Sequence, residues 1–206
     1  NNNDVSDNAF NFNEDSVIFS GNSNVIDNNI IFTSGKKGIQ LTNGDGNQIS
    51  NNKVYDSNHN GIDIGTVDND SNDNDVFDNF IDNLFAADPE PYAMLKITNG
   101  INNELRNNTI VDGIGHGINL RGSFNFVAGN YIGVMSDGVT TRPIESDGVV
   151  IRGVGNQVGS MRNGNVSGNH IVTSTHSYAD GIDVWGEASG AIDIEGNFIG
   201  TNASGD

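Results

Sequence analysis

The stretch Asn24-Val-Ile-Asp-Asn-Asn-Ile-Ile31 contains the pattern that the rest of the chain repeats. With Asn24 as position 1, the same frame fits windows that begin at Asn3, Asn24, Asn47, Asn74, Asn103, Asn125, Gly164 and Ile192. Position 3 is held by Val5, Ile26, Ile49, Val76, Leu105, Val127, Val166 and Ile194. Position 6 is always asparagine, at Asn8, Asn29, Asn52, Asn79, Asn108, Asn130, Asn169 and Asn197. Position 8 is always large and apolar. One constant pattern repeated every 20–50 residues or so is typical of a solenoid.

A second motif, Gly-apolar-x-apolar, lies between these windows. It is found at Gly38–Leu41, Gly61–Ile64, Gly117–Leu120, Gly148–Ile151 and Gly181–Val184, with weaker copies at Ser16–Phe19 and Met94–Ile97. Short segments that alternate in this way predict half-buried strands. No stretch has apolar residues sustained at helical spacing, so we expect almost no helix. Stacked repeats would bury the inward side chains in one continuous column.

The asparagine at position 6 lies between two inward residues, so the chain must bend there. Asparagine tolerates the left-handed conformation that such a bend can require. Its amide can also bond to the asparagine of the next repeat, which predicts a ladder along the solenoid. Neighbouring repeats should then be about 4.8 Å apart, the spacing of paired strands.

The segments Gly129-Asn-Tyr-Ile-Gly-Val-Met-Ser-Asp-Gly138 and Gly196-Asn-Phe-Ile-Gly-Thr-Asn-Ala-Ser-Gly205 resemble the repeats of the right-handed parallel β-helix (pectate-lyase-like) superfamily, as do Gly155–Gly159 and Asn165–Asn169. The resemblance covers the whole chain and is closest to the repeat regions of long bacterial surface proteins. It implies an all-β solenoid of about eight coils, with residues 1–206 as one domain. Because one fold can carry many activities, the resemblance alone does not indicate which one.

Composition narrows the classes of partner. The 206 residues carry a formal charge of −18 and no cysteine, and no run of 18 apolar residues is present. Such acidity disfavours nucleic acid and anionic membranes as partners, and no membrane insertion is expected. We expect an extracellular or cell-surface location. The chain lacks recognisable caps, which predicts a fragment of a longer solenoid, or self-association through open solenoid ends.

Basic residues collect on one predicted face. In Gly-apolar-x-apolar strands the x residues point outward, and they read Ile18, Gln40, Asp63, Lys96, Asn119, Val150 and Asp183. Two residues further on, the same face carries Ser20, Thr42, Gly65, Thr98, Arg121, Arg152 and Trp185. We call Lys96, Arg121, Arg152 and Trp185 the basic strip. Together with Asn119 and Asp183 it predicts a binding site for acidic polysaccharide, because arginine forks bind carboxylates and tryptophan stacks on sugar rings.

Two readings of the basic strip remain open. In a structural or binding module, its long side chains cover an outward strand or hold a ligand. In a polysaccharide lyase or epimerase, Lys96 would be the base and Arg121 would neutralise the uronate carboxylate. Those two residue types resemble the Lys and Arg pair of the β-helical alginate and chondroitin lyases. A hydrolase would need paired carboxylates, for which Asp56, Asp82 and Asp112 form a candidate patch.

One segment offers metal ligands. Asp68, Asp70, Asn72, Asp73 and Asp75 alternate with other polar residues and place several oxygens in one loop, which suits calcium. Asp73 stands where a calcium loop has glycine, so the match is partial, and an acidic solvated turn is the alternative. Lys36 and Lys37 are expected in a solvated turn. Three longer loops, 85–92, 133–147 and 172–180, each follow a position 8 residue and are expected along one side.

Overall fold

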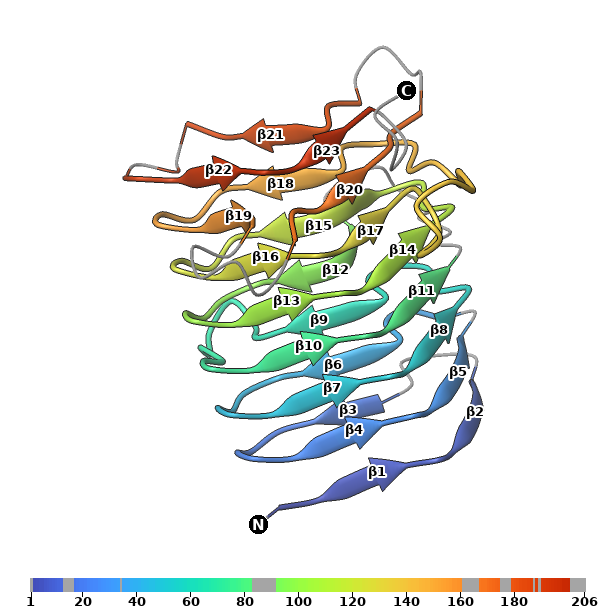
Figure 1. Ribbon diagram of the computed structural model, residues 1–206. Coiled ribbons are helices and arrows are strands. Elements are labelled where there is room, and N and C mark those ends of the chain that lie inside the picture. Colours follow the sequence, from blue (N-terminus) through green and yellow to red (C-terminus); the bar gives the residue numbers. More distant parts are fainter. Residues whose placement is uncertain are drawn as a thin grey trace.

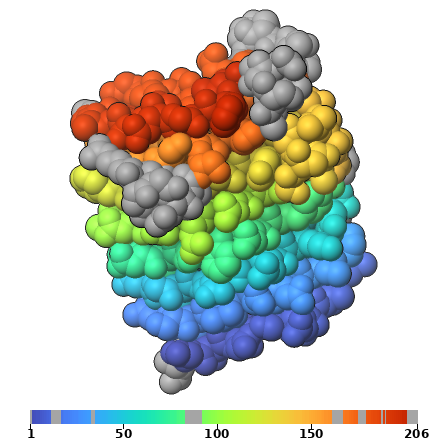
Figure 2. Space-filling model, viewed as in Figure 1, coloured from blue at the N-terminus to red at the C-terminus, as the bar shows by residue number. Residues whose placement is uncertain are grey.

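The computed structural model describes residues 2–12, 17–33, 35–82, 92–160, 167–174, 179–186, 188 and 190–200. It is a right-handed parallel β-helix in which successive turns of the chain lie on one another like layers (Figure 1). The space-filling view shows the same order as stacked bands from the N-terminus to the C-terminus (Figure 2). The described residues contain no helix. The fold expected from the repeats is therefore confirmed.

Three parallel sheets form the walls. Sheet A contains β1 (Asp4–Ser6), β4 (Val25–Asp27), β7 (Gln48–Ser50), β10 (Asp75–Phe77), β13 (Glu104–Arg106), β16 (Phe126–Ala128), β19 (Gln157–Gly159) and β22 (Asp193–Glu195). Sheet B contains β2 (Ala9–Phe12), β5 (Ile30–Thr33), β8 (Lys53–Tyr55), β11 (Phe80–Asp82), β14 (Thr109–Val111), β17 (Tyr131–Ile132), β20 (His170–Ile171) and β23 (Phe198–Ile199). Sheet C contains β3 (Val17–Phe19), β6 (Ile39–Leu41), β9 (Ile62–Ile64), β12 (Ala93–Ile97), β15 (His116–Leu120), β18 (Val149–Ile151) and β21 (Ile182–Val184).

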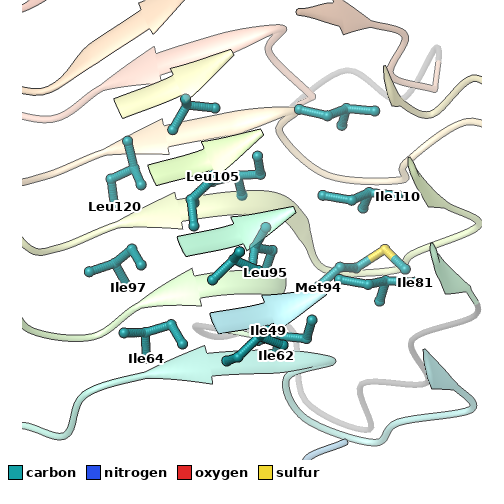
Figure 3. Close-up of a cluster of buried hydrophobic side chains, with 14 of the residues drawn as sticks. Ile49, Ile62, Ile64, Ile81, Met94, Leu95, Ile97, Leu105, Ile110 and Leu120 are labelled. Atoms are coloured by element: carbon teal, nitrogen blue, oxygen red, sulfur yellow. The ribbon is translucent and has the colours of Figure 1, made fainter. Parts of the chain in front are cut away.

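The core is a set of apolar columns that run along the solenoid. In sheet C, Ile97 lies opposite Ile64 on one side and Leu120 on the other, and all three are fully buried. Figure 3 shows this column beside the inward residues of the other sheets. Each parallel register keeps like residues in contact, so every coil buries its apolar side chains against the next. In the last coil, Ile194 and Ile199 are 42% and 46% exposed. Self-association through the solenoid ends stays a prediction.

Sheet A corrects one repeat of the sequence frame. Val127 of β16 pairs with Val158 of β19, and Val158 pairs with Ile194 of β22. The apolar residue at this level is therefore Val158, and not Val166, which lies outside the described residues. In the other repeats the position 3 residue lies three residues before the position 6 asparagine. In this repeat an insertion separates Val158 from Asn169, so the same spacing points to Val166 instead. The position 8 column matches the register throughout sheet B.

Two asparagine ladders stabilise the turns, although the sequence frame predicted only one. At position 6, the backbone and side-chain amides of Asn79 both donate to Asn108 Oδ1, at 3.0 Å each. At position 1, Asn74 donates in the same way to Asn103. The left-handed residue is the one before position 6, as at Asn28, Asn51 and Asn107, and the expected place of the bend was wrong by one residue. Asn79 and Asn108 are buried, and the ladder supplies the hydrogen-bond partners that buried amides need.

Candidate functional site

The outward row of sheet C is aligned as the sequence predicted, but the expectation of half-buried strands was wrong here, because Lys96 is only 8% exposed and Asn119 and Val150 are fully buried. Lys96 of β12 lies between Asp63 and Asn119, and Asn119 lies between Lys96 and Val150. Backbone hydrogen bonds continue past the strand ends, from Arg121 to Ile97, from Arg152 to Leu120 and from Trp185 to Ile151. The second row of outward side chains is therefore held in register too. The basic strip lies on successive coils, about 4.8 Å apart.

Lys96 is a buried cation at the centre of this face. Lys96 is only 8% exposed. Burial lowers the pKa of Lys96 below its ordinary value of 10.5, and the nearby positive charges of Arg121, Lys37 and Arg152 lower it further, against the opposing effect of Asp63. A neighbouring pocket of about 310 Å³ is lined by Lys37, Asp63, Tyr92 and Lys96, among others. This end of the face therefore combines open volume with an excess of positive charge.

Asp63 is held by a network that the sequence did not reveal. It is 2% exposed and lies 2.7 Å from Lys37 Nζ. It also accepts hydrogen bonds from Thr98 Oγ1 at 2.6 Å and Asn60 Nδ2 at 2.9 Å. The expectation that Lys37 lies in a plain solvated turn was wrong. Lys37 is partly buried and reaches a carboxylate on the next coil. The sequence around Lys37 contains no pattern that predicts this contact.

Arg121, Arg152 and Asn119 have unused hydrogen-bonding capacity. Both polar atoms of the Asn119 side chain are buried without a partner, and so are Arg121 Nε and Arg152 Nε and Nη2. The Arg152 guanidinium lies over the Trp185 ring, 3.6 Å from its centre. Trp185 Nε1 donates to Asp183 Oδ2 at 2.6 Å. The structure thus brings together all five predicted ligand-binding residues, and Asp183 is already engaged by Trp185.

A second buried cluster lies at the corner between sheets B and C. His116 Nδ1 is 3.1 Å from Asp147 Oδ2 and 3.0 Å from Ser146 Oγ. Asp147 Oδ1 accepts the backbone N–H of Asp180 at 2.8 Å. Burial raises the pKa of Asp147, but the hydrogen bonds from His116 and Asp180 outweigh it and the net shift is downward. Both side-chain partners use the same ring nitrogen, so this is not a serine–histidine–aspartate relay, which uses both nitrogens.

Two of the three longer loops run from sheet B to sheet C. Loop 133–147 and the described parts of 172–180 leave sheet B and return to sheet C at this corner, as expected. Of loop 85–92, only Tyr92 is described, and the rest lies outside the described residues. The Tyr92 ring stacks on His59 at 4.4 Å between ring centres.

The carboxylate patch predicted at Asp56, Asp82 and Asp112 contains an arginine that binds two of its members. Arg142 donates to both oxygens of Asp82 at 2.9–3.1 Å and to Asp112 Oδ2 at 2.5 Å. Burial raises the pKa of Asp82, and the charge of Arg142 acts against this shift. Two of the three candidate carboxylates, Asp82 and Asp112, are therefore bound to one guanidinium, and this geometry lends no support to glycoside hydrolysis.

The oxygens of the acidic segment 68–75 are directed to different partners. Asn72 Oδ1 accepts the backbone N–H of Ile101 at 2.9 Å, and Asp75 is hydrogen-bonded to Arg106. Asp68 and Asp70 are exposed, and Asp73 is a left-handed turn residue. In the part of the chain that the structure describes, no group of three or more His, Asp or Glu could hold a metal ion. This geometry lends no support to a calcium site, which stays a prediction from the sequence.

The chain was compared with families of known proteins. A family model described as periplasmic copper-binding protein (NosD) matches residues 1–88. No curated protein and no solved structure matches the chain. No helix in the described residues is long and apolar enough to cross a membrane.

The residues present do not fit copper. Copper sites in proteins use histidine, cysteine and methionine, and the matched segment contains only His59 of these. His59 is stacked on Tyr92, His116 bonds to Asp147, and His170 lies between Tyr131 and Phe198. His176 lies outside the described residues. Among the described residues, no three or more histidine, aspartate or glutamate side chains form a group that could hold a metal ion.

Proposed function

We propose that this chain is an exported β-helix module that binds acidic polysaccharide along the outward face of sheet C. The family description places its members in the periplasm, which agrees in a coarse sense with the extracellular or cell-surface location expected from the sequence. The observation that carries the proposal is the basic strip. The chain is strongly acidic and has only nine lysines and arginines. Four of them lie close together at this face, namely Lys37, Lys96, Arg121 and Arg152.

The arrangement suits an extended ligand better than a compact one. The outward residues repeat at each coil, so cations and polar groups recur at about 4.8 Å along the solenoid. A linear polymer with a charge on each sugar can meet several of them at once. Salt should weaken such binding, because it screens the attraction between this row of cations and the charges of the polymer while the polymer is still in solvent.

The proposal is tested by measuring binding of polygalacturonate, alginate and chondroitin, with dextran as the neutral control. Arg152→Gln should weaken binding about tenfold or more, because a hydrogen bond to a charged group is lost. Lys53→Gln makes the same change of charge on an exposed residue of sheet B and should leave binding unchanged. Binding of none of the acidic polymers, or equal loss in both variants, would overturn the proposal.

A second candidate is β-elimination from a uronate, and the buried Lys96 is the observation that favours it. Its lowered pKa makes the neutral amine available at lower pH than for an ordinary lysine. The amine would take the C5 proton, the C5–H electron pair would form the C4–C5 double bond, and the C4–O bond would break as its oxygen gains a proton. The rate should then rise with pH as Lys96 loses its proton.

The assay is the ultraviolet absorbance of the unsaturated product. Lys96→Arg keeps the positive charge but provides no neutral base, so it should abolish elimination and retain binding. Absence of the chromophore with every acidic polymer that binds would rule out this second candidate and leave the binding module.

A further inference from the structure

Unsatisfied polar atoms concentrate at one place on the outward face of sheet C. Of the ten buried side-chain atoms without a hydrogen-bond partner in the described part of the chain, five belong to Asn119, Arg121 and Arg152. These residues lie on two adjacent coils, β15 and β18, which are paired in register. Buried polar groups in folded proteins are nearly always paired, so a cluster of exceptions calls for an explanation.

The chemistry of these atoms describes the missing partner. Four are donors, namely Asn119 Nδ2, Arg121 Nε and Arg152 Nε and Nη2, and one is an acceptor, Asn119 Oδ1. Within the described residues neither arginine forms an ion pair with a carboxylate. Nε and Nη2 of one guanidinium form a planar fork that matches the two oxygens of a carboxylate. The single acceptor would take a hydroxyl donor beside that carboxylate.

The fork is held in place before any ligand arrives. Arg152 lies 3.6 Å from the centre of the Trp185 ring, and Asp183 fixes the indole through a 2.6 Å hydrogen bond. A cation stacked on an aromatic face loses little further freedom on binding, which favours affinity. Asp183 is therefore a positioning residue, which refines its predicted role as a ligand residue. On the other side of Asn119, Lys96 adds positive charge.

From these contacts we infer that Asn119, Arg121 and Arg152, backed by Trp185, form a subsite for one uronic acid unit, in which the arginines bind the carboxylate and Asn119 Oδ1 accepts a neighbouring hydroxyl. This inference rests on the proposed function, because it names the sugar class that the sheet C face selects. It also separates the ligand-binding arginines from Arg142 and Arg106, whose guanidinium groups are already paired with aspartates.

The test compares a galacturonate pentasaccharide with its fully methyl-esterified form by isothermal titration calorimetry on the 206-residue chain. The two probes share every hydroxyl and differ in the carboxylates. The acid should bind at least about tenfold more tightly, which corresponds to one charged hydrogen-bond contact. Arg152→Lys keeps the charge and loses the fork, so it should lower affinity for the acid about tenfold and leave affinity for the ester unchanged. Lys53→Gln is the control, and unchanged circular dichroism shows that each variant is folded.

The outcomes separate the subsite from the proposed function. If acid and ester bind equally, or if Arg152→Lys binds the acid as well as the unaltered chain does, the subsite is wrong while polysaccharide binding stands. If a sulfated pentasaccharide binds more tightly than the galacturonate pentasaccharide of the same length, the site is selective for sulfate and the uronate assignment fails. If neither pentasaccharide nor any acidic polymer binds, the proposed function and the subsite fail together.

Discussion

At the scale of single residues, asparagine side chains form the hydrogen bonds between coils at the turns, as backbone groups do within the sheets. Asn108 is fully buried, and its Oδ1 accepts both amides of Asn79. Its own side-chain amide donates to Val76 O at 2.9 Å and to Asn130 Oδ1 at 3.0 Å. Each ladder residue therefore satisfies the turn before it and the turn after it, and no other side chain of this size offers both a donor and an acceptor in that geometry.

We expect Asn108→Ala to lower the free energy of unfolding by about 3 kcal/mol or more. Several buried groups, including the backbone N–H of Asn79, lose their partner at once, and each costs about 1–3 kcal/mol. Urea denaturation followed by circular dichroism measures the change.

Asn43→Ala is the matched control. Asn43 is exposed, and the change should shift stability by less than about 0.5 kcal/mol. A loss in Asn108→Ala no larger than in Asn43→Ala would show that the ladder contributes little.

At the scale of secondary-structure elements, a column of glycines sets the distance between sheets B and C. Gly38, Gly61 and Gly148 each immediately precede a sheet C strand, and Gly117 is the second residue of β15. A Cβ atom at these positions would come within 2.3–2.6 Å of an inward side chain of sheet B, Val54, Ile81, Ile132 or Ile171. The glycines are needed because the corner is too tight for any side chain.

Gly117→Ala should destabilise the fold by about 1–3 kcal/mol, the usual cost of an extra methyl group in a packed core. Its Cβ would meet Ile132 Cγ2 and Gly148 O, both at 2.6 Å. Thermal unfolding of the variant measures the effect.

Gly186→Ala provides the comparison, because nothing lies within 4 Å of a Cβ there. Its midpoint should equal that of the unaltered chain. Equal midpoints for both variants would mean that the corner relaxes to admit the methyl group.

At the scale of the whole molecule, stacking in parallel decides which distant residues become neighbours. It aligns Lys96, Asn119 and Val150 from three coils. It also gives each described histidine ring a different contact, with Tyr92 for His59, Asp147 for His116 and Tyr131 for His170. The same architecture therefore concentrates cations on sheet C and disperses the nitrogen ligands that copper would need.

We predict that the chain does not retain copper. After incubation with one equivalent of Cu(II), or of Cu(I) under reducing conditions, gel filtration should remove the metal, as measured by atomic emission. Without a convergent set of ligands, binding should be no stronger than that of isolated surface histidines. One copper ion per chain that survives gel filtration would contradict this prediction.

The spacing of the repeats was enough to predict the fold, the position 6 ladder, the position 8 column and the outward row of sheet C. Strands alternate with a period of two, and identical repeats stack in register, so a residue such as Arg121 could be placed on one face beside Arg152. These features depend only on spacing within each repeat. They needed no knowledge of the loops.

The contacts that depend on insertions and turns could not be predicted from the repeats. Val127 pairs with Val158, and not with Val166 as the repeat predicted. The sequence does not show where the insertion between Val158 and Asn169 begins, so it did not reveal which valine takes this place. Lys37 reaches Asp63, and Arg142 reaches Asp82, across coils and through loops whose paths the repeat does not encode. The unpaired atoms of Asn119 and Arg152 also became visible only in three dimensions, because a missing partner is a property of everything that surrounds a side chain.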